Sequence, residues 1–195
     1  MIRLGVVGHS GYADLPGVLR TLGELAPALG LQLWYERELH DAAPDSAPAT
    51  STIDAVPYGT WEVVRRGSEV AILAVGTMVL PSRAAADALA AEGLNPTVVN
   101  CRFLKPFDEV TLAAVLAEHK HILVVEEGTV VNGFGAYISS VIARHDSSVR
   151  VAVHGVPDRI IHAAPRARQL AACGLNAAGI ADRVRALLES EAIAG

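Results

Sequence analysis

The run Ile122-Leu-Val-Val125 constrains the fold of this chain more than any other stretch, because all four residues are apolar. A half-buried strand alternates apolar and polar residues, whereas a short continuous apolar run is typical of a strand buried on both faces. Strands of that kind belong to parallel sheets with helices on both sides. The run therefore predicts a parallel sheet covered by helices.

Strand and helix patterns alternate around this run, as they do in α/β proteins. The sequence predicts strands over 69–75, 97–101, 122–125 and 149–154, and helices over 80–92, 108–119, 135–144, up to 173, and from 176 onward. Glycines at 93 and 174 follow two of the helices, and Asn176 is placed to cap the last one. We expect a three-layer α/β domain with a mostly parallel sheet over residues 58–195.

The first 57 residues have a different organisation. Residues 1–40 predict a β-α-β extension, with strands over 3–8 and 31–36 and a helix over 15–29 that Asp14 caps and that Pro27 ends early. Residues 41–57 are rich in Pro, Ala and Ser. Pro44, Pro48 and Pro57, with small polar residues between them, can continue neither a helix nor a central strand, so we interpret this segment as a linker.

Two carboxylates, Glu126 and Glu127, follow the apolar run directly, and Gly133 and Gly135 precede the next helix. Ligands and partners dock beyond the carboxyl ends of parallel strands, so this acidic pair is a candidate site. The alternative is that both glutamates only accept backbone N–H bonds and pair with a nearby arginine. From the residues alone we favour this alternative.

A basic turn, Arg102-Phe-Leu-Lys-Pro106, follows the preceding strand, and Asp108 is placed to cap the next helix. Arg102 and Lys105 are candidates for binding an anion at the sheet edge. They are equally suited to pairing with Glu126 or Glu127 across neighbouring strand ends, and this pairing is our default expectation.

The histidines suggest no metal site. His119 and His121 flank a lysine at a helix end, and we expect both at the surface. His154 and His162 lie on either side of a loop that contains Asp158 and Arg159. One of these two histidines beside Glu126 or Glu127 would make a proton-transfer pair, and a hydrogen-bonded structural role is the alternative.

Composition excludes several classes of protein. The chain has 195 residues, of which 51% are hydrophobic, so it can bury a core. Its net charge of −5 argues against a nucleic-acid-binding module, and no apolar run reaches the roughly 18 residues that cross a bilayer. We find no secretory signal, and we expect the two cysteines, Cys101 and Cys173, to be buried and reduced in the cytoplasm.

Five motifs in order carry a resemblance to a known family. They are Ala71-Ile-Leu-Ala-Val-Gly-Thr-Met78, the segment 98–108 around the basic turn, the segment 124–135 around the glutamates, Gly155-Val-Pro-Asp-Arg-Ile-Ile-His162 and Cys173-Gly-Leu-Asn-Ala-Ala-Gly-Ile180. Together they resemble the C-terminal domain of the transketolase family, most closely that of the 1-deoxy-D-xylulose-5-phosphate synthases, over residues 58–188. Asn176 stands where the synthases usually carry an aspartate.

The resemblance implies a mixed, mainly parallel sheet of five strands. It also implies that the complete enzyme uses thiamine diphosphate and Mg²⁺ to join decarboxylated pyruvate to glyceraldehyde 3-phosphate, for isoprenoid and thiamine biosynthesis. The domains that bind the cofactor are not in this sequence, so we transfer no catalytic residue. We expect an assembly domain that forms a homodimer or binds a partner carrying the thiamine-diphosphate domains. Its candidate interface residues are Arg102, Lys105, Asp108, Glu126, Glu127, Gly133, Gly135, Asp158, Arg159 and His162.

Three other hypotheses stay open. Gly5-Val-Val-Gly-His-Ser-Gly-Tyr12 weakly resembles the start of bacterial NAD kinases, although Pro57-Tyr-Gly-Thr-Trp61 stands where their catalytic motif is expected. A stand-alone nucleotide- or anion-binding module would use residues 8–11 and the Arg102/Lys105 edge. A docking domain similar to the β subunit of 2-oxo acid dehydrogenases would use Glu126 and Glu127.

Overall fold

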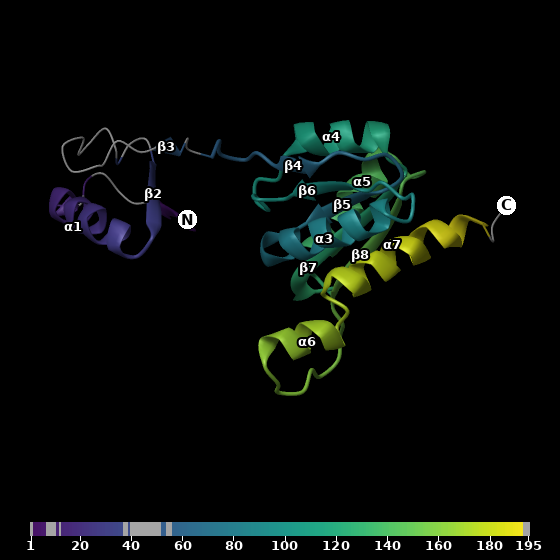
Figure 1. The fold of residues 1–195 in the computed structure, drawn as a ribbon. Coiled ribbons are helices and arrows are strands. Elements are labelled where there is room, and N and C mark those ends of the chain that lie inside the picture. Colours follow the sequence, from purple (N-terminus) through teal and green to yellow (C-terminus); the bar gives the residue numbers. More distant parts are fainter. Residues whose placement is uncertain are drawn as a thin grey trace. The chain divides into compact units, whose positions relative to one another are not determined.

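The computed structural model describes residues 2–6, 11, 13–36, 39, 52–53 and 56–192. The chain divides into two compact units, Met1–Pro57 and Tyr58–Gly195, and Figure 1 shows the helices and strands of each. The predicted linker, 41–57, lies mostly outside the described residues. Within it, Thr52–Ile53 forms a short strand, β3, that the composition did not indicate.

The first unit is a three-stranded parallel sheet with one helix. Its elements are β1 (Ile2–Val6), α1 (Leu15–Ala28), β2 (Leu31–Glu36) and β3, in the sheet order β1-β2-β3. Leu15 and Leu19 of α1 form one buried cluster with Leu33 and Tyr35 of β2. The predicted β-α-β arrangement is therefore confirmed.

Details of the first unit differ from the prediction. Pro27 does not end α1, which continues to Ala28, and Asp14 holds the N-cap position without a side-chain cap bond. Of the proposed phosphate-binding turn at residues 8–11, only Gly11 is among the described residues.

The second unit contains the predicted alternation of strands and helices. Its elements are β4 (Glu62–Arg65), β5 (Ala71–Ala74), the 3-10 helix η1 (Gly76–Met78), α3 (Val79–Ala90), β6 (Thr97–Asn100), α4 (Glu109–Glu118), β7 (His121–Thr129), α5 (Phe134–His145), β8 (Arg150–Val156), α6 (Arg166–Ala172) and α7 (Ala177–Ala192). Among the described residues, none of the helices is both long and apolar enough to cross a membrane.

These strands form a five-stranded sheet in the order β4-β6-β5-β7-β8. The strands β5 to β8 pair in parallel, and β4 pairs antiparallel with β6 at the edge. The mostly parallel five-stranded sheet is confirmed. Strand β4 was not predicted from the sequence, because its four residues are only partly buried and show no continuous apolar run.

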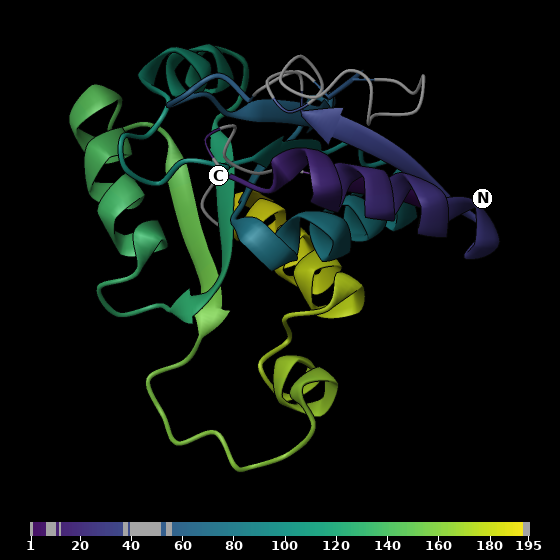
Figure 2. The same ribbon diagram turned by 90° about the vertical axis from the view of Figure 1, so that its left-hand side faces the viewer.

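The two faces of the sheet bury separate apolar clusters. On β7, Ile122 and Val124 join the cluster with α4 and α5, whereas Leu123 and Val125 join the cluster with α3 and α7. All four side chains are 0% exposed. Figure 2 shows α5 and α7 on opposite sides of β7 and β8. The apolar run is thus covered on both faces, as its composition predicts.

His119 and His121 are buried, so the prediction that both lie at the surface is wrong. The His119 ring has Nδ1 3.1 Å from the Val115 carbonyl and Nε2 3.0 Å from the Thr97 hydroxyl. The Thr97 hydroxyl also accepts the Gly67 N–H at 2.8 Å. Both ring nitrogens of His119 therefore have a hydrogen-bond partner inside the fold. Local sequence gives no sign of these distant partners.

Asp108 caps α4, as predicted, and also fixes the start of the second unit. Its Oδ1 accepts the Thr111 N–H at 2.9 Å, and its Oδ2 accepts the Thr111 hydroxyl and the Trp61 N–H, each at 2.8 Å. The Trp61 indole N–H donates in turn to the Phe103 carbonyl at 2.7 Å. One carboxylate therefore joins the segment before β4 to the first turn of α4.

We expect Asp108→Ala to lower the free energy of unfolding of the second unit by about 2–4 kcal/mol, because it removes a helix cap and leaves the buried Trp61 N–H without its acceptor. Urea denaturation followed by Trp61 fluorescence measures the change. Asp158→Ala is the matched control, because Asp158 lies in an exposed loop, and it should change the free energy by no more than about 0.5 kcal/mol. Equal effects of the two substitutions would contradict the role given to Asp108.

The same carboxylate should make stability depend on pH. Burial alone raises the pKa of Asp108, but the hydrogen bonds from Thr111 and Trp61 outweigh burial and hold that pKa below its ordinary value. The ionised group therefore stabilises the fold above the unfolded-state pKa of about 3.9, and this contribution is lost as pH falls through the folded-state pKa. The stability difference between wild type and Asp108→Asn should be constant above about pH 5 and shrink below about pH 4. A difference independent of pH would contradict this.

Candidate functional site

Glu126 lies on β7 at the carboxyl end of the sheet and is 4% exposed. Its Oε2 accepts the Phe134 N–H at 3.1 Å and its Oε1 accepts the Gly135 N–H at 2.8 Å. Helix N-termini carry free N–H groups and a partial positive charge, which a carboxylate satisfies. Glu126 is therefore a buried cap of α5, the second of the two interpretations that the sequence left open.

Four glycines surround this carboxylate. A Cβ atom at Gly128 would lie 2.6 Å from Glu126 Oε2, and one at Gly133 would lie 2.6 Å from Oε1 and 2.2 Å from the Thr129 carbonyl. A Cβ atom at Gly135 would lie 2.4 Å from Val153 Cγ1 and 3.0 Å from Oε1, and one at Gly155 would lie 2.7 Å from the Gly128 carbonyl and 3.2 Å from the Glu126 Cγ. Glycine is required at Gly133 above all, because the conflicting atom there belongs to backbone. The glycines of this segment make room for the glutamate, not for a ligand.

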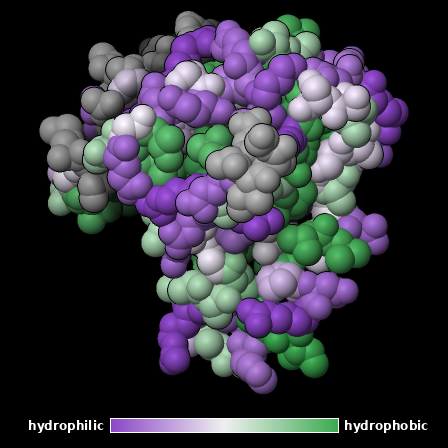
Figure 3. All heavy atoms as spheres, turned by 90° about the vertical axis from the view of Figure 1, so that its right-hand side faces the viewer, coloured by the Kyte–Doolittle hydropathy of each residue, from purple (hydrophilic) through white to green (hydrophobic). Residues whose placement is uncertain are grey.

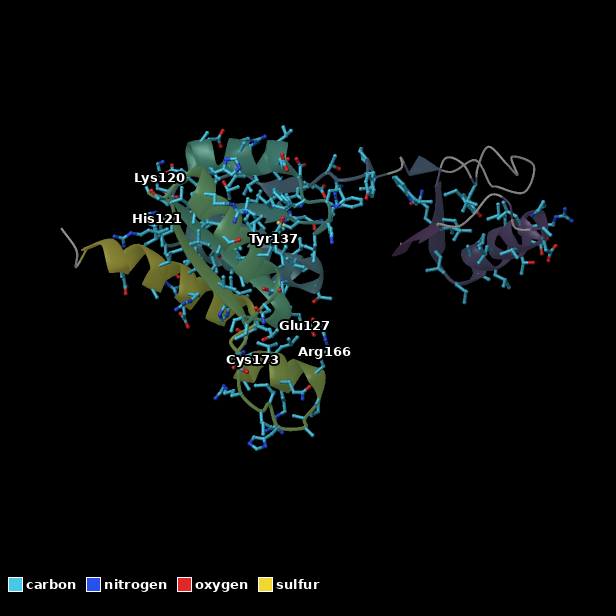
Figure 4. All side chains as sticks on the ribbon, turned by 180° about the vertical axis from the view of Figure 1, so that it is seen from behind. Lys120, His121, Glu127, Tyr137, Arg166 and Cys173 are labelled. Atoms are coloured by element: carbon cyan, nitrogen blue, oxygen red, sulfur yellow. The ribbon has the colours of Figure 1, made fainter. Side chains whose placement is uncertain are left out.

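Glu127 points the other way, toward solvent and toward α6. It accepts the Thr77 hydroxyl at 2.5 Å, and Arg166 donates to it from Nε at 2.9 Å and from a terminal nitrogen. These bonds from Arg166 and Thr77 hold the pKa of Glu127 below its ordinary value. Figure 4 shows Glu127 and Arg166 facing each other between the sheet and α6. The expected pairing of Arg102 or Lys105 with Glu126 or Glu127 is therefore wrong.

Arg102 is held by the segment that leads into β4. It donates from Nε to the Thr60 carbonyl at 3.2 Å and from a terminal nitrogen to the Thr60 hydroxyl at 2.9 Å, and it lies 3.5 Å from the Glu62 carboxylate. Lys105 forms no ion pair with any residue in the described part of the chain. Of the two candidate anion ligands, only Lys105 is thus available.

Residues 157–176 leave the sheet after β8, carry α6 and return to α7; we call them the excursion. None of the α6 residues is buried. Figure 2 shows this segment extending away from the body of the sheet, and Figure 3 shows charged and apolar residues side by side on its surface. Two bonds tie the excursion to itself, since Arg159 donates to the Ala172 carbonyl at 3.3 Å and Gln169 donates to the His162 carbonyl at 3.1 Å. Besides the Glu127 pair, Leu170, Cys173 and Leu175 attach it to the domain by packing against the cluster of α3 and α7.

The histidines beside the excursion do not meet the glutamates. His154 Nε2 lies 2.9 Å from the Gly174 carbonyl, which gives it the structural role left open by the sequence. His162 lines a hollow of about 410 Å³ together with Arg159 and Arg168. The exposed Asp158 precedes this hollow and is not one of its lining residues. A proton-transfer pair between a histidine and Glu126 or Glu127 is not formed.

A hollow of the second unit, which we call the aromatic groove, has a volume of about 600 Å³. It lies between the basic turn, the start of α4 and the start of α5. Its lining residues are Leu104, Lys105, Pro106, Phe107, Glu109, Asn132, Gly133, Phe134 and Tyr137. It contains two of the predicted interface residues, Lys105 and Gly133. The sequence analysis missed its aromatic side chains, Phe107, Phe134 and Tyr137, which come from two distant segments. It also missed Arg166 and Thr77 as partners of Glu127.

The described residues do not fit a metal-dependent cofactor. Among them, no three His, Cys, Asp or Glu side chains come together in a group that could hold a metal ion. We assign no cofactor to the described residues and derive no catalytic step from them.

We expect Glu126→Gln to destabilise the second unit by about 2–3 kcal/mol, because the amide keeps one acceptor and turns a donor toward an N–H group of α5. Urea denaturation measures the loss. Glu127→Gln is the matched control on the next residue, and because it removes only an exposed pair, its cost should be about 0–1 kcal/mol. If both variants unfold at the same urea concentration, Glu126 is not the cap on which α5 depends.

The pair of Glu127 and Arg166 should control how firmly α6 is held. In Glu127→Gln we expect faster amide hydrogen exchange in α6 and unchanged exchange in β7, because the helix buries no residue of its own. Exchange followed by mass spectrometry resolves the two segments. Arg166→Gln should give the same pattern, and the double variant should add nothing further. Unchanged exchange in α6 would exclude the pair as its anchor.

Comparison with known proteins identifies the second unit. The model of the family described as "Transketolase, C-terminal domain" matches residues 59–180. A 1-deoxy-D-xylulose-5-phosphate synthase of Synechococcus sp. (strain JA-2-3B'a(2-13)) is 39% identical over 142 residues, which cover 73% of this chain and 22% of the synthase. The synthase of Geobacillus thermodenitrificans (strain NG80-2) is 40% identical over 144 residues, which cover 72% of this chain and 22% of the synthase.

A solved structure gives the same result. The chain of a split gene transketolase, described as an inactive beta4 tetramer, superposes with a TM-score of 0.62 at 26% identity, covering 77% of this chain and 53% of that one. The present chain spans only about a fifth of the length of the curated relatives, since the matches cover 22% of each. Because the family model matches more than half of its residues, this chain belongs to the transketolase C-terminal domain family.

Proposed function

We propose that residues 58–195 are the C-terminal assembly domain of a thiamine-diphosphate-dependent transferase similar to 1-deoxy-D-xylulose-5-phosphate synthase, and that they carry no catalytic group. The observation that carries the proposal is the 39% identity to the Synechococcus synthase, which extends over 142 residues. The reaction of the complete enzyme would join decarboxylated pyruvate to glyceraldehyde 3-phosphate in the synthesis of isoprenoid and thiamine precursors.

The geometry of the charges at the carboxyl end of the sheet supports a structural role. Glu126 is used to cap α5, Asp108 to cap α4, and Arg102 to hold the segment before β4. A group that already satisfies buried backbone N–H groups is not free to exchange a proton with a substrate, because leaving those groups unpaired is costly. We therefore place the chemistry of the complete enzyme outside this chain.

A partner would then supply the missing parts. The cofactor-binding domains, with thiamine diphosphate and Mg²⁺, would be carried by a second polypeptide or by a longer form of this protein in the cytoplasm. The solved split gene transketolase supports the first arrangement, because it is a transketolase encoded by a split gene. The weak resemblance of residues 1–57 to NAD kinases stays a prediction, and these residues lie outside the family match at 59–180.

The two alternative functions have less support. In an anion-binding module that uses Arg102 and Lys105, Arg102 would not be available to the anion, because it already bonds Thr60 and pairs with Glu62. A docking domain that uses Glu126 and Glu127 would have only Glu127 at its surface, and Arg166 already neutralises that carboxylate. Neither arrangement offers the free charges that its ligand or partner would need.

A domain graft tests the proposed function. Residues 58–195 would replace the matching C-terminal segment of the Synechococcus synthase, and formation of 1-deoxy-D-xylulose 5-phosphate would be measured. We expect the graft to be active and the synthase without its C-terminal segment to be inactive, because the grafted residues complete the assembly. The matched control is the same graft with Glu126→Gln, which should lose activity together with thermal stability. A graft that is folded by circular dichroism and yet as inactive as the truncated synthase would contradict the proposal.

A further inference from the structure

We propose that the hollow of about 410 Å³ in the excursion binds a small organic phosphate, and that Arg159 and Arg168 hold its phosphate group. We call this hollow the excursion hollow. The proposal concerns the chain by itself, so it goes beyond the proposed function and does not depend on it. It also uses a different surface from the turn that carries Arg102 and Lys105.

The excursion hollow lies between the loop that follows β8 and the helix α6. The loop contributes residues 159–164 to its lining, and α6 contributes Arg168, Gln169 and Ala172. Arg168 and Ala172 are four residues apart, so they lie on the same face of the helix. The Arg159 side chain donates to the Ala172 carbonyl at 3.3 Å, and Gln169 donates to a carbonyl of the loop at 3.1 Å. The excursion's own bonds therefore hold the two walls of the hollow together.

Every ionisable side chain that lines the excursion hollow is basic. These side chains are Arg159, His162 and Arg168, and all three are exposed. A neighbouring hollow of about 310 Å³, which shares Arg159, adds Arg183 to its lining and again contains no carboxylate. The chain as a whole has a net charge of −5, so this gathering of positive charge is not a general property of its surface. Basic groups in a concave surface focus a positive potential, which attracts an anion.

The protein does not neutralise the two guanidinium groups of the hollow. Four other arginines of the second unit pair with a carboxylate, namely Arg65, Arg102, Arg166 and Arg185. Among the described residues neither Arg159 nor Arg168 forms such a pair, and the adjacent Asp158 does not line the hollow. A guanidinium has five N–H donors, so the single bond from Arg159 to Ala172 leaves most of that group available. Both arginines are therefore free to bind an anion.

A phosphate group matches these donors. A guanidinium presents its N–H groups as a planar fork that fits two phosphate oxygens, and two arginines balance the two negative charges of a phosphate monoester. Ile160 and Ile161 line the same hollow, and Ile160 is 87% exposed, so an apolar body attached to the phosphate has a surface to contact. The volume lies within the range of small-molecule pockets, about 300–1,000 Å³. These properties together indicate a small molecule that joins a phosphate group to an apolar body.

Nuclear magnetic resonance of the full chain at constant ionic strength tests the inference, with phenyl phosphate as the probe. We expect saturable shifts of the backbone amides of residues 159–172, with a dissociation constant of about 1 mM or lower. Inorganic phosphate lacks the apolar body, and benzoate replaces the phosphate by a carboxylate. Each of these two should bind at least about threefold more weakly than phenyl phosphate.

Substitutions of single arginines locate the site. Arg168→Gln should raise the dissociation constant of phenyl phosphate at least about tenfold, because it removes a charged fork from the phosphate. Arg168 donates no side-chain hydrogen bond within the described part of the chain, so this variant should keep its fold. Arg159→Gln should weaken binding by a similar factor. The matched control is Arg83→Gln, which removes the same charge from the exposed surface of α3 and should leave binding unchanged.

Three results would each overturn the inference. The first is a wild-type chain without saturable shifts at about twenty times the expected dissociation constant. The second is equal weakening by Arg83→Gln and Arg168→Gln, because only net charge would then matter. The third is benzoate or inorganic phosphate binding as tightly as phenyl phosphate. None of these readouts uses synthase activity, so an inactive graft and a chain that binds no phosphate are separate failures.

Discussion

The buried carboxylate of Glu126 is the interaction on which this end of the domain depends. It stands at the carboxyl end of the central strand pair β5 and β7 and accepts two N–H groups from the first turn of α5. A buried charge is tolerated only where hydrogen bonds replace the water it has lost, and the helix terminus provides them. Gly128, Gly133 and Gly155 leave the space that the side chain fills. The glutamate and its glycines therefore act as one unit, and a change in any of them affects the position of α5.

The other charges at this end of the sheet are used in the same way. Asp108 fixes α4, Arg102 fixes the chain before β4, and Glu127 holds α6 through Arg166. In most α/β enzymes the carboxyl ends of the strands are kept free for ligands. In this domain the loops and helices that connect the strands contact one another at that edge, and the exposed surface beside it is apolar. This distribution supports the proposed role of joining other parts of an enzyme.

The sequence predicted those features that are encoded within a few residues. The apolar run Ile122–Val125 indicated a strand covered on both faces, and Asp108 indicated a helix start, since both signals are local. It did not predict the partner of Glu127, because Arg166 lies 39 residues further along the chain on an excursion that no periodicity describes. It placed His119 at the surface, because only the folded sheet brings Thr97 to its ring. The aromatic groove was missed for the same reason, since its residues come from the distant segments 104–109 and 132–137.

The two cysteines differ in their exposure to solvent, so one of them can carry a fluorescent label in the unaltered protein. Cys101 is 1% exposed, and burial together with the nearby charge of Asp108 raises the pKa of its thiol, so it stays protonated and out of reach of thiol reagents. Cys173 follows the last residue of α6 and is partly exposed (Figure 4). A maleimide probe added to the unaltered protein would therefore attach at one place, the joint between the excursion and α7. Fluorescence from that position would follow the motion of α6 without any engineered residue.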